Sequence, residues 1–126
     1  MQNLCRLRHD EQVRLDPECV SALYAAMGDA RAERYVCHAM EELAVLLSAA
    51  QVAFDARNSM EMTAALGSLI GMAQEVGMGS LARVARDLVD ATRAGDPVAQ
   101  AATLARLVRI GDRSLTAVWD LRDMSV

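Results

Sequence analysis

SMEMTAALGSLIGMAQEVGMG, residues 59–79, repeats an apolar side chain every three or four positions. The repeating positions are Met62, Leu66, Leu69, Ala73 and Val76. At the helical period this spacing places them on one stripe, which is typical of an amphipathic helix packed on a core. The segment therefore predicts a helix with one buried side.

The opposite side of this helix carries no charge. With its flanks it comprises Met60, Thr63, Ala64, Gly67, Ile70, Gly71, Gln74 and Met78. Two glycines in a helix interior cost about 1 kcal/mol each relative to alanine. A helix that is uncharged almost all round is usually covered on both sides. We infer that this face offers a flat, small-residue surface to a partner; the alternative is that a neighbouring helix of the same chain covers the glycines.

The composition favours one helical domain. A chain of 126 residues can bury a real core. Hydrophobic residues make up 53% and aromatic residues 3%, so the core must consist of Leu, Val, Ala and Met. Only two prolines and few β-branched runs occur, which favours helix over strand. The net charge of −4 argues against a nucleic-acid surface, which needs a clustered basic face.

Local signals divide the chain into helices. Asp-Pro pairs at 16–17 and 96–97 each predict a helix start, with a carboxylate cap followed by proline in the first turn. The predicted helices cover about residues 16–28, 29–57, 59–77, 80–95 and 97 onward. Short joints make neighbouring helices antiparallel. We predict an all-α fold: an antiparallel up-and-down four-helix bundle with a short N-terminal helix, in one domain of residues 16–126 that follows an extension of residues 1–15.

Gly111 lies on the apolar side of the last predicted helix, after Leu104 and Val108. Glycine at this position costs about 1 kcal/mol of helix propensity. Because it has no side chain, it lets a neighbouring helix come close. We therefore expect a close helix–helix approach at this residue.

The cysteines and the N-terminus favour a cytoplasmic protein. Cys5, Cys19 and Cys37 are odd in number and include no CxxC pair, which is typical of a reduced compartment. The N-terminal sequence MQNLCRLRHDEQ lacks the apolar run of a signal peptide. The longest apolar stretch, residues 43–54, is too short to span a bilayer. We therefore expect a soluble cytoplasmic protein without a membrane segment.

No set of side chains indicates catalysis, a metal ion or a cofactor. His9 and His38 are the only histidines, and we expect His38 on a solvated face near Glu41 and Glu42. Consecutive residues diverge on a helix, so His38 and its neighbour Cys37 do not make a metal site by themselves. Nothing places a histidine base beside a cysteine. We predict that the chain is not an enzyme and binds neither cofactor nor metal.

GSLIGMAQEVGMGSLARVARDLVDATRAGD, residues 67–96, resembles the signature of histidine-containing phosphotransfer (HPt) domains. In that family a phosphorylatable histidine is followed by x-Leu-Lys-Gly, then a small residue, then a glycine and a leucine that close into the next helix. The matching positions are Leu69, Gly71, Ala73, Gly77 and Leu81. The resemblance covers about residues 15–122 and implies an HPt-like bundle.

The chain departs from this family at the residue that carries the chemistry. Gly67 stands at the position of the phospho-accepting histidine, and Ile70 at that of the lysine. Glycine has no nucleophile, so phosphoryl transfer through position 67 is chemically impossible, and Ile70 removes a charge that would favour a phosphoryl group. The resemblance still implies that this face docks response-regulator receiver domains or histidine kinase domains. We predict a non-catalytic adaptor of two-component phosphorelay signalling that binds its partner through the eight outer-face residues.

Two alternatives stay open. The first is a genuine phosphocarrier with His38 as a relocated acceptor, although carboxylates around His38 would repel phosphate. The second is a homodimer, because glycine-lined helices permit close self-packing.

Overall fold

The computed structural model describes residues 16–125, with side chains as far as residue 114. The predicted extension of residues 1–15, with Cys5 and His9, lies outside the described residues. The helices are α2 (Pro17–Met27), α3 (Asp29–Asp55), α4 (Ser59–Glu75), α5 (Gly79–Ala94) and α6 (Pro97–Ser125). No strand occurs in the described part of the chain. The predicted all-α fold is confirmed, with helix ends close to those expected from the sequence.

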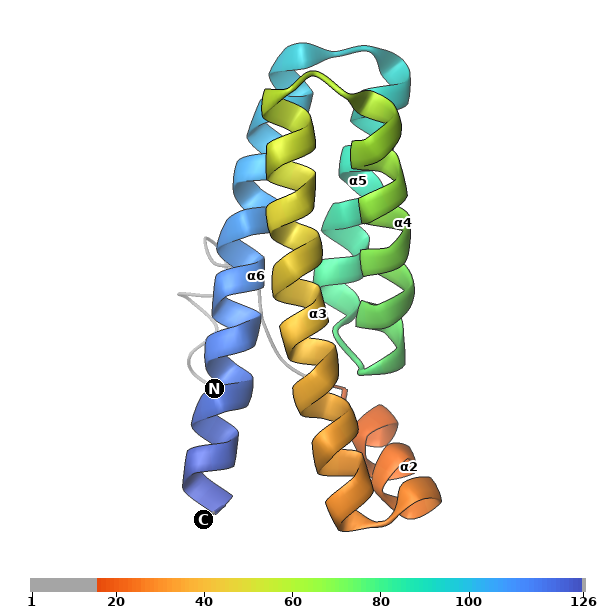
Figure 1. Ribbon diagram of the computed structural model, residues 1–126, viewed down its shortest axis with the longest axis vertical. Helices are drawn as coiled ribbons and strands as arrows, with labels where there is room; N and C mark the ends of the chain where they lie inside the picture. The colour runs from red at the N-terminus through yellow and green to blue at the C-terminus, as the bar shows by residue number, and fades with distance from the viewer. Residues whose placement is uncertain (1–15, 126) are drawn as a thin grey trace, which may run out of the picture.

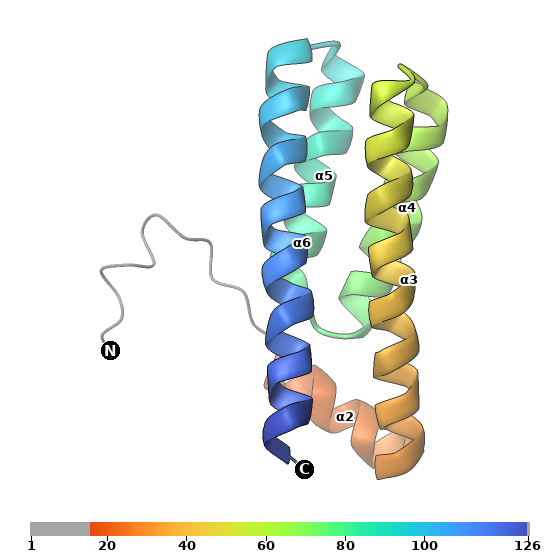
Figure 2. The same cartoon turned by 60° about the vertical axis from the view of Figure 1, so that its left-hand side comes forward.

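Four helices lie side by side, and each runs opposite to the one before it (Figures 1 and 2). α3 packs against α4, α4 against α5, and α5 against α6, while α6 also contacts α3. The short α2 contacts α3 and lies across the end at which α4 meets α5 (Figure 2). α3 and α6 extend beyond α4 and α5 at this end (Figure 1).

The two aspartates predicted to start helices do cap them. The side chain of Asp16 accepts a hydrogen bond from the Glu18 amide, at the start of α2. Asp96 accepts from the Ala99 amide at the start of α6. Between them, Asn58 accepts from the Glu61 amide and caps α4. These bonds satisfy amide donors that have no partner within the helix.

Three helices end in the same left-handed turn. α3, α4 and α5 are followed by Arg57, Gly77 and Gly95, with φ of 60°, 80° and 66°. In each turn the next amide donates to a carbonyl five residues back, at 2.8, 2.8 and 3.2 Å, which is the Schellman pattern. Glycine adopts this backbone freely, whereas a residue with a Cβ pays roughly 1 kcal/mol. Arg57 therefore occupies a position that glycine fills in the other two turns.

The core lies between the four long helices. The predicted stripe of α4 is buried, since Met62, Leu66, Leu69, Ala73 and Val76 are at most 1% exposed. Among the described residues, other large side chains that are at most 2% exposed include Met40, Leu43, Leu81, Val84, Leu88, Leu107 and Ile110. Burying side chains of this size contributes about 1.5–3 kcal/mol each. The apolar repeat of residues 59–79 thus holds α4 in one orientation.

Hydrogen bonds from both α2 and α3 reach the end of α4. The Asp16 amide donates to the Gly77 carbonyl at 2.8 Å. The Cys19 thiol donates to the Glu75 carbonyl at 3.2 Å, and the Tyr35 hydroxyl of α3 donates to Glu75 Oε1. α2 has no fully buried residue, and apart from these bonds it packs against α3.

α3 alone, among the helices of the described part of the chain, is long and apolar enough to cross a membrane by length and composition. The sequence estimate considered only residues 43–54, and the helix is longer. Core helices of soluble proteins have the same character, and α3 packs against α4 and α6. The absence of a membrane-spanning segment therefore stays a prediction.

Candidate interaction surface on α4

The two interior glycines of α4 face solvent. Gly67 and Gly71 are exposed, and a Cβ added to either would meet nothing within 4 Å beyond its chain neighbours and the backbone of α4. The alternative that a neighbouring helix of the same chain covers these glycines is therefore wrong for the residues that the structure describes. The glycines leave a shallow strip of bare backbone along the helix.

Seven of the eight predicted outer-face residues do lie on this side of α4. Met60 is 83% exposed, and Ala64 and Gln74 are exposed as well. Thr63 and Ile70 are half-buried at the flanks. The structure therefore brings together a surface of small and apolar side chains centred on Gly67 and Gly71.

The prediction for Met78 is wrong. Met78 is only 3% exposed and belongs to the core. α4 ends at Glu75, and Gly77 with its φ of 80° turns the chain inward. Met78 therefore no longer follows the helical period that would have placed it beside Gln74.

The surface continues onto α3, which the sequence reasoning did not identify. Val45 and Val52 of α3 are 60% and 65% exposed. With Ala49 and Ala64 they line an open groove between α3 and α4. The sequence did indicate this contribution, since Val45 and Val52 are two helical turns apart and lie off the buried stripe of α3. We call the outer side of α4 with this groove the α3–α4 face.

The centre of the α3–α4 face carries no charge. α4 has no ionisable residue between Glu61 and Glu75, and α3 has none between Glu42 and Asp55. The residues that bound both uncharged runs are carboxylates. An uncharged centre with an acidic border resembles the apolar core and polar rim of protein interfaces.

His38 lies elsewhere, exposed on α3. It borders a shallow depression with Glu33, Arg34, Cys37 and Glu41, so it does have the carboxylate neighbour that was expected. Cys19 and Cys37 are free thiols. No group of three or more His, Cys, Asp or Glu side chains within the described residues is placed to hold a metal ion.

The centre of the α3–α4 face carries no ionisable side chain. Gly67 has no side chain, and the residues one helical turn from it are Thr63, Ala64, Ile70 and Gly71. The arrangement can bind another molecule by close contact.

Comparison of the chain with protein-family models, with curated proteins and with solved structures finds no match. The inferences that follow therefore rest on the sequence and on the geometry described above.

Proposed function

We propose that this chain is a non-catalytic, HPt-like adaptor of two-component phosphorelay signalling in the cytoplasm. It binds a response-regulator receiver domain or a histidine kinase domain through the α3–α4 face. Binding competes with, or scaffolds, phosphotransfer between other proteins.

The finer fold assignment belongs to the same proposal. α3 to α6 correspond to the antiparallel up-and-down bundle of an HPt domain, and α2 corresponds to its short N-terminal helix. The positions that match the HPt signature support this correspondence: Leu69 and Ala73 are buried, whereas Gly71 is exposed. A phosphotransfer helix needs the same division between a buried stripe and an accessible outer side.

The observation that carries the proposal is the open space above Gly67. In the proposed correspondence this residue takes the place of the phospho-accepting histidine, and among the described residues no other helix covers it. A face that has lost the histidine could still bind a partner closely, because binding requires an accessible surface and does not require a nucleophile. The acidic border formed by Glu61, Glu75 and Asp55 favours a partner whose own contact surface is bordered by basic residues.

Calorimetric titration against receiver and kinase domains from the same genome, purified one by one, tests the proposal. Gly67→Arg adds a long charged side chain at the centre of the α3–α4 face. The matched control is Ala105→Arg, at an exposed position of α6. We expect at least one domain to bind the wild type, Gly67→Arg to weaken its binding about tenfold or more, and Ala105→Arg to leave it unchanged. Equal binding by Gly67→Arg would contradict the proposal.

A second candidate function is that of a phosphocarrier with His38 as the phosphoryl acceptor, because His38 is exposed. This function predicts acid-labile phosphate on the chain after incubation with a phosphorylated receiver, and its loss in His38→Ala. Glu33 and Glu41 border the same depression, and their charges oppose the approach of a phosphoryl group. Self-association through the α3–α4 face is the third outcome, and sedimentation over a range of concentrations detects it.

A further inference from the structure

A cavity of about 450 Å³ opens at the end of the fold opposite α2. It lies where the turn between α3 and α4 faces the first turn of α6. Its volume falls within the range of about 300–1,000 Å³ typical of small-molecule sites. The cavity adjoins the α3–α4 face at Asp55, but Gly67 and Gly71 do not line it, and the proposed adaptor function does not use it.

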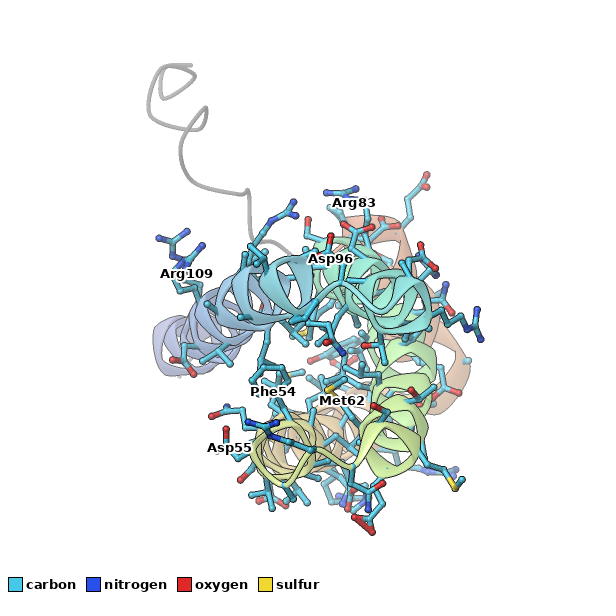
Figure 3. The ribbon with its side chains drawn as sticks, turned by 90° about the horizontal axis from the view of Figure 1, so that it is seen from above. Phe54, Asp55, Met62, Arg83, Asp96 and Arg109 are labelled. Atoms are coloured by element: carbon cyan, nitrogen blue, oxygen red, sulfur yellow. The ribbon has the colours of Figure 1, made fainter. Side chains whose placement is uncertain are left out.

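The inner wall of the cavity is apolar. Phe54 of α3 and Met62 of α4 both line it, and both point into the space between the α3–α4 pair and the α5–α6 pair (Figure 3). Met62 is 1% exposed and Phe54 is half-buried. On the α6 side, the half-buried Gln100 donates to Thr92 Oγ1 at 3.1 Å, which fixes its amide group. An apolar ligand body would contact the aromatic ring and the thioether.

The border of the cavity carries a cation. Arg57 lines it and is exposed, and no ion pair joins Arg57 to a carboxylate of the described residues. Asp55 also borders the cavity, but it lies on the outer side of α3, whereas Phe54 points inward (Figure 3). Since Phe54 and Arg57 line the same cavity, an anionic group bound there could pair with the guanidinium of Arg57.

The position of Arg57 in its turn gives a second reason to assign it a role. Of the three Schellman turns, two have glycine at the left-handed residue and the third has Arg57. Glycine would hold the same turn without strain, so the turn itself does not require an arginine. Arginine differs from glycine here by its cationic side chain, so any role of this residue lies in that side chain.

We infer that the cavity between Phe54, Met62 and Gln100 binds a small amphipathic monoanion, whose carboxylate pairs with Arg57 and whose apolar body lies against Phe54 and Met62. The chemical class is that of medium-chain monocarboxylates. Arginine presents a planar pair of donors that matches a carboxylate. The apolar wall favours an anion with an apolar chain, because a small inorganic anion would make no contact with Phe54 and Met62.

Titration of the full chain with octanoate, followed by amide chemical shifts in NMR spectra, tests this inference. 1-Octanol supplies the same apolar chain without the charge, and acetate supplies the carboxylate without the chain. We expect saturable octanoate binding, with the largest shifts at Asn58, Ser59 and Gln100. Octanol should bind about tenfold more weakly, and acetate should not saturate.

The variants separate the charge from the fold. Arg57→Gly should weaken octanoate binding about tenfold and leave octanol binding unchanged, and Arg57→Lys should restore part of the loss. Since glycine suits this turn, Arg57→Gly should melt no lower than the wild type, so a loss of binding cannot come from unfolding. Arg83→Ala, at an exposed site on the outer side of α5 (Figure 3), is the matched control and should bind as the wild type does.

Three results would overturn the inference: octanoate shifts that do not saturate or that scatter over the surface, equal binding of octanol and octanoate, or equal octanoate binding by Arg57→Gly. Each would leave the proposed adaptor function intact, because the α3–α4 face and its Gly67→Arg test do not involve this cavity.

Discussion

Gly111 of α6 lies directly against Leu47 of α3. A Cβ added at Gly111 would come closer to Leu47 Cδ1 than van der Waals contact allows. Leu47 is itself buried in the core, so its side chain cannot move aside without disturbing its neighbours. The close helix approach expected from the sequence at Gly111 is confirmed, and its partner is α3.

Gly111→Ala should lower the free energy of unfolding by about 1 kcal/mol. Alanine gains about 1 kcal/mol of helix propensity, but overpacking a core costs about 1–3 kcal/mol, and the second effect is the larger. Urea denaturation followed by circular dichroism measures the difference. A variant more stable than the wild type would show that Leu47 repacks freely.

The same substitution on the outer side of α4 should have the opposite sign. Gly67→Ala and Gly71→Ala place a methyl group in open space, so each should raise the free energy of unfolding by about 0.5–1 kcal/mol. Urea denaturation followed by circular dichroism measures the change. All three variants replace a helical glycine by alanine, so they differ only in what surrounds the added methyl group. Destabilisation by either outer variant would mean that something packs on the α3–α4 face in solution.

The helix ends were predictable because local chemistry sets them. Asp16 and Asp96 cap helices whose first residue is proline, and Gly95 ends α5 in the left-handed conformation that glycine favours. The buried stripe of α4 was predictable for a similar reason, since its period is a property of the helix itself. The error at Met78 arose because the helical period was extended past Glu75, where the chain has already turned.

The surface was only partly predictable. The exposure of Gly67 and Gly71 was expected from the uncharged side of one helix, but the contribution of Val45 and Val52 depends on which helix lies beside α4. The cavity beside Phe54 depends on the distance between the end of α3 and the start of α6. No local sequence pattern predicts that distance. Tertiary arrangement decides both features.

Arg57→Gly should raise the free energy of unfolding by about 0.5–1 kcal/mol. Arg57 has a φ of 60°, and the left-handed conformation costs roughly 1 kcal/mol for a residue with a Cβ. Glycine also has more freedom to lose on folding, which offsets part of the gain. Thermal and urea unfolding measure the change, and a clear loss of stability would indicate that the arginine side chain holds the turn.

Gly77→Ala, at the corresponding position after α4, should destabilise the protein by about 2 kcal/mol. Gly77 has a φ of 80°, and a Cβ there would lie 3.0 Å from the Asp16 amide nitrogen and 3.2 Å from Cys19 Cβ. The variant combines backbone strain with displacement of α2. Hydrogen exchange should show the Asp16 amide, which donates to the Gly77 carbonyl, losing its protection. Unchanged protection would contradict the contact between α2 and this turn.

The bond between Tyr35 and Glu75 should make stability depend on alkaline pH. The hydrogen bond to Glu75 raises the pKa of Tyr35 above its ordinary value of 10.0, and partial burial and the negative charges of Glu75 and Cys19 raise it further. Because the pKa is higher in the folded state, this contribution to stability is fully present below about pH 10 and is lost as the pH rises through the folded-state pKa.

Tyrosinate absorbance in a Tyr24→Phe background reports Tyr35 alone, since the chain has two tyrosines. Glu75→Gln removes the charged acceptor and should lower the pKa of Tyr35 toward its ordinary value. Tyr35→Phe should remove this part of the alkaline loss of stability in urea titrations. An unchanged pKa of Tyr35 in Glu75→Gln would show that this bond does not hold α3 to the end of α4 in solution.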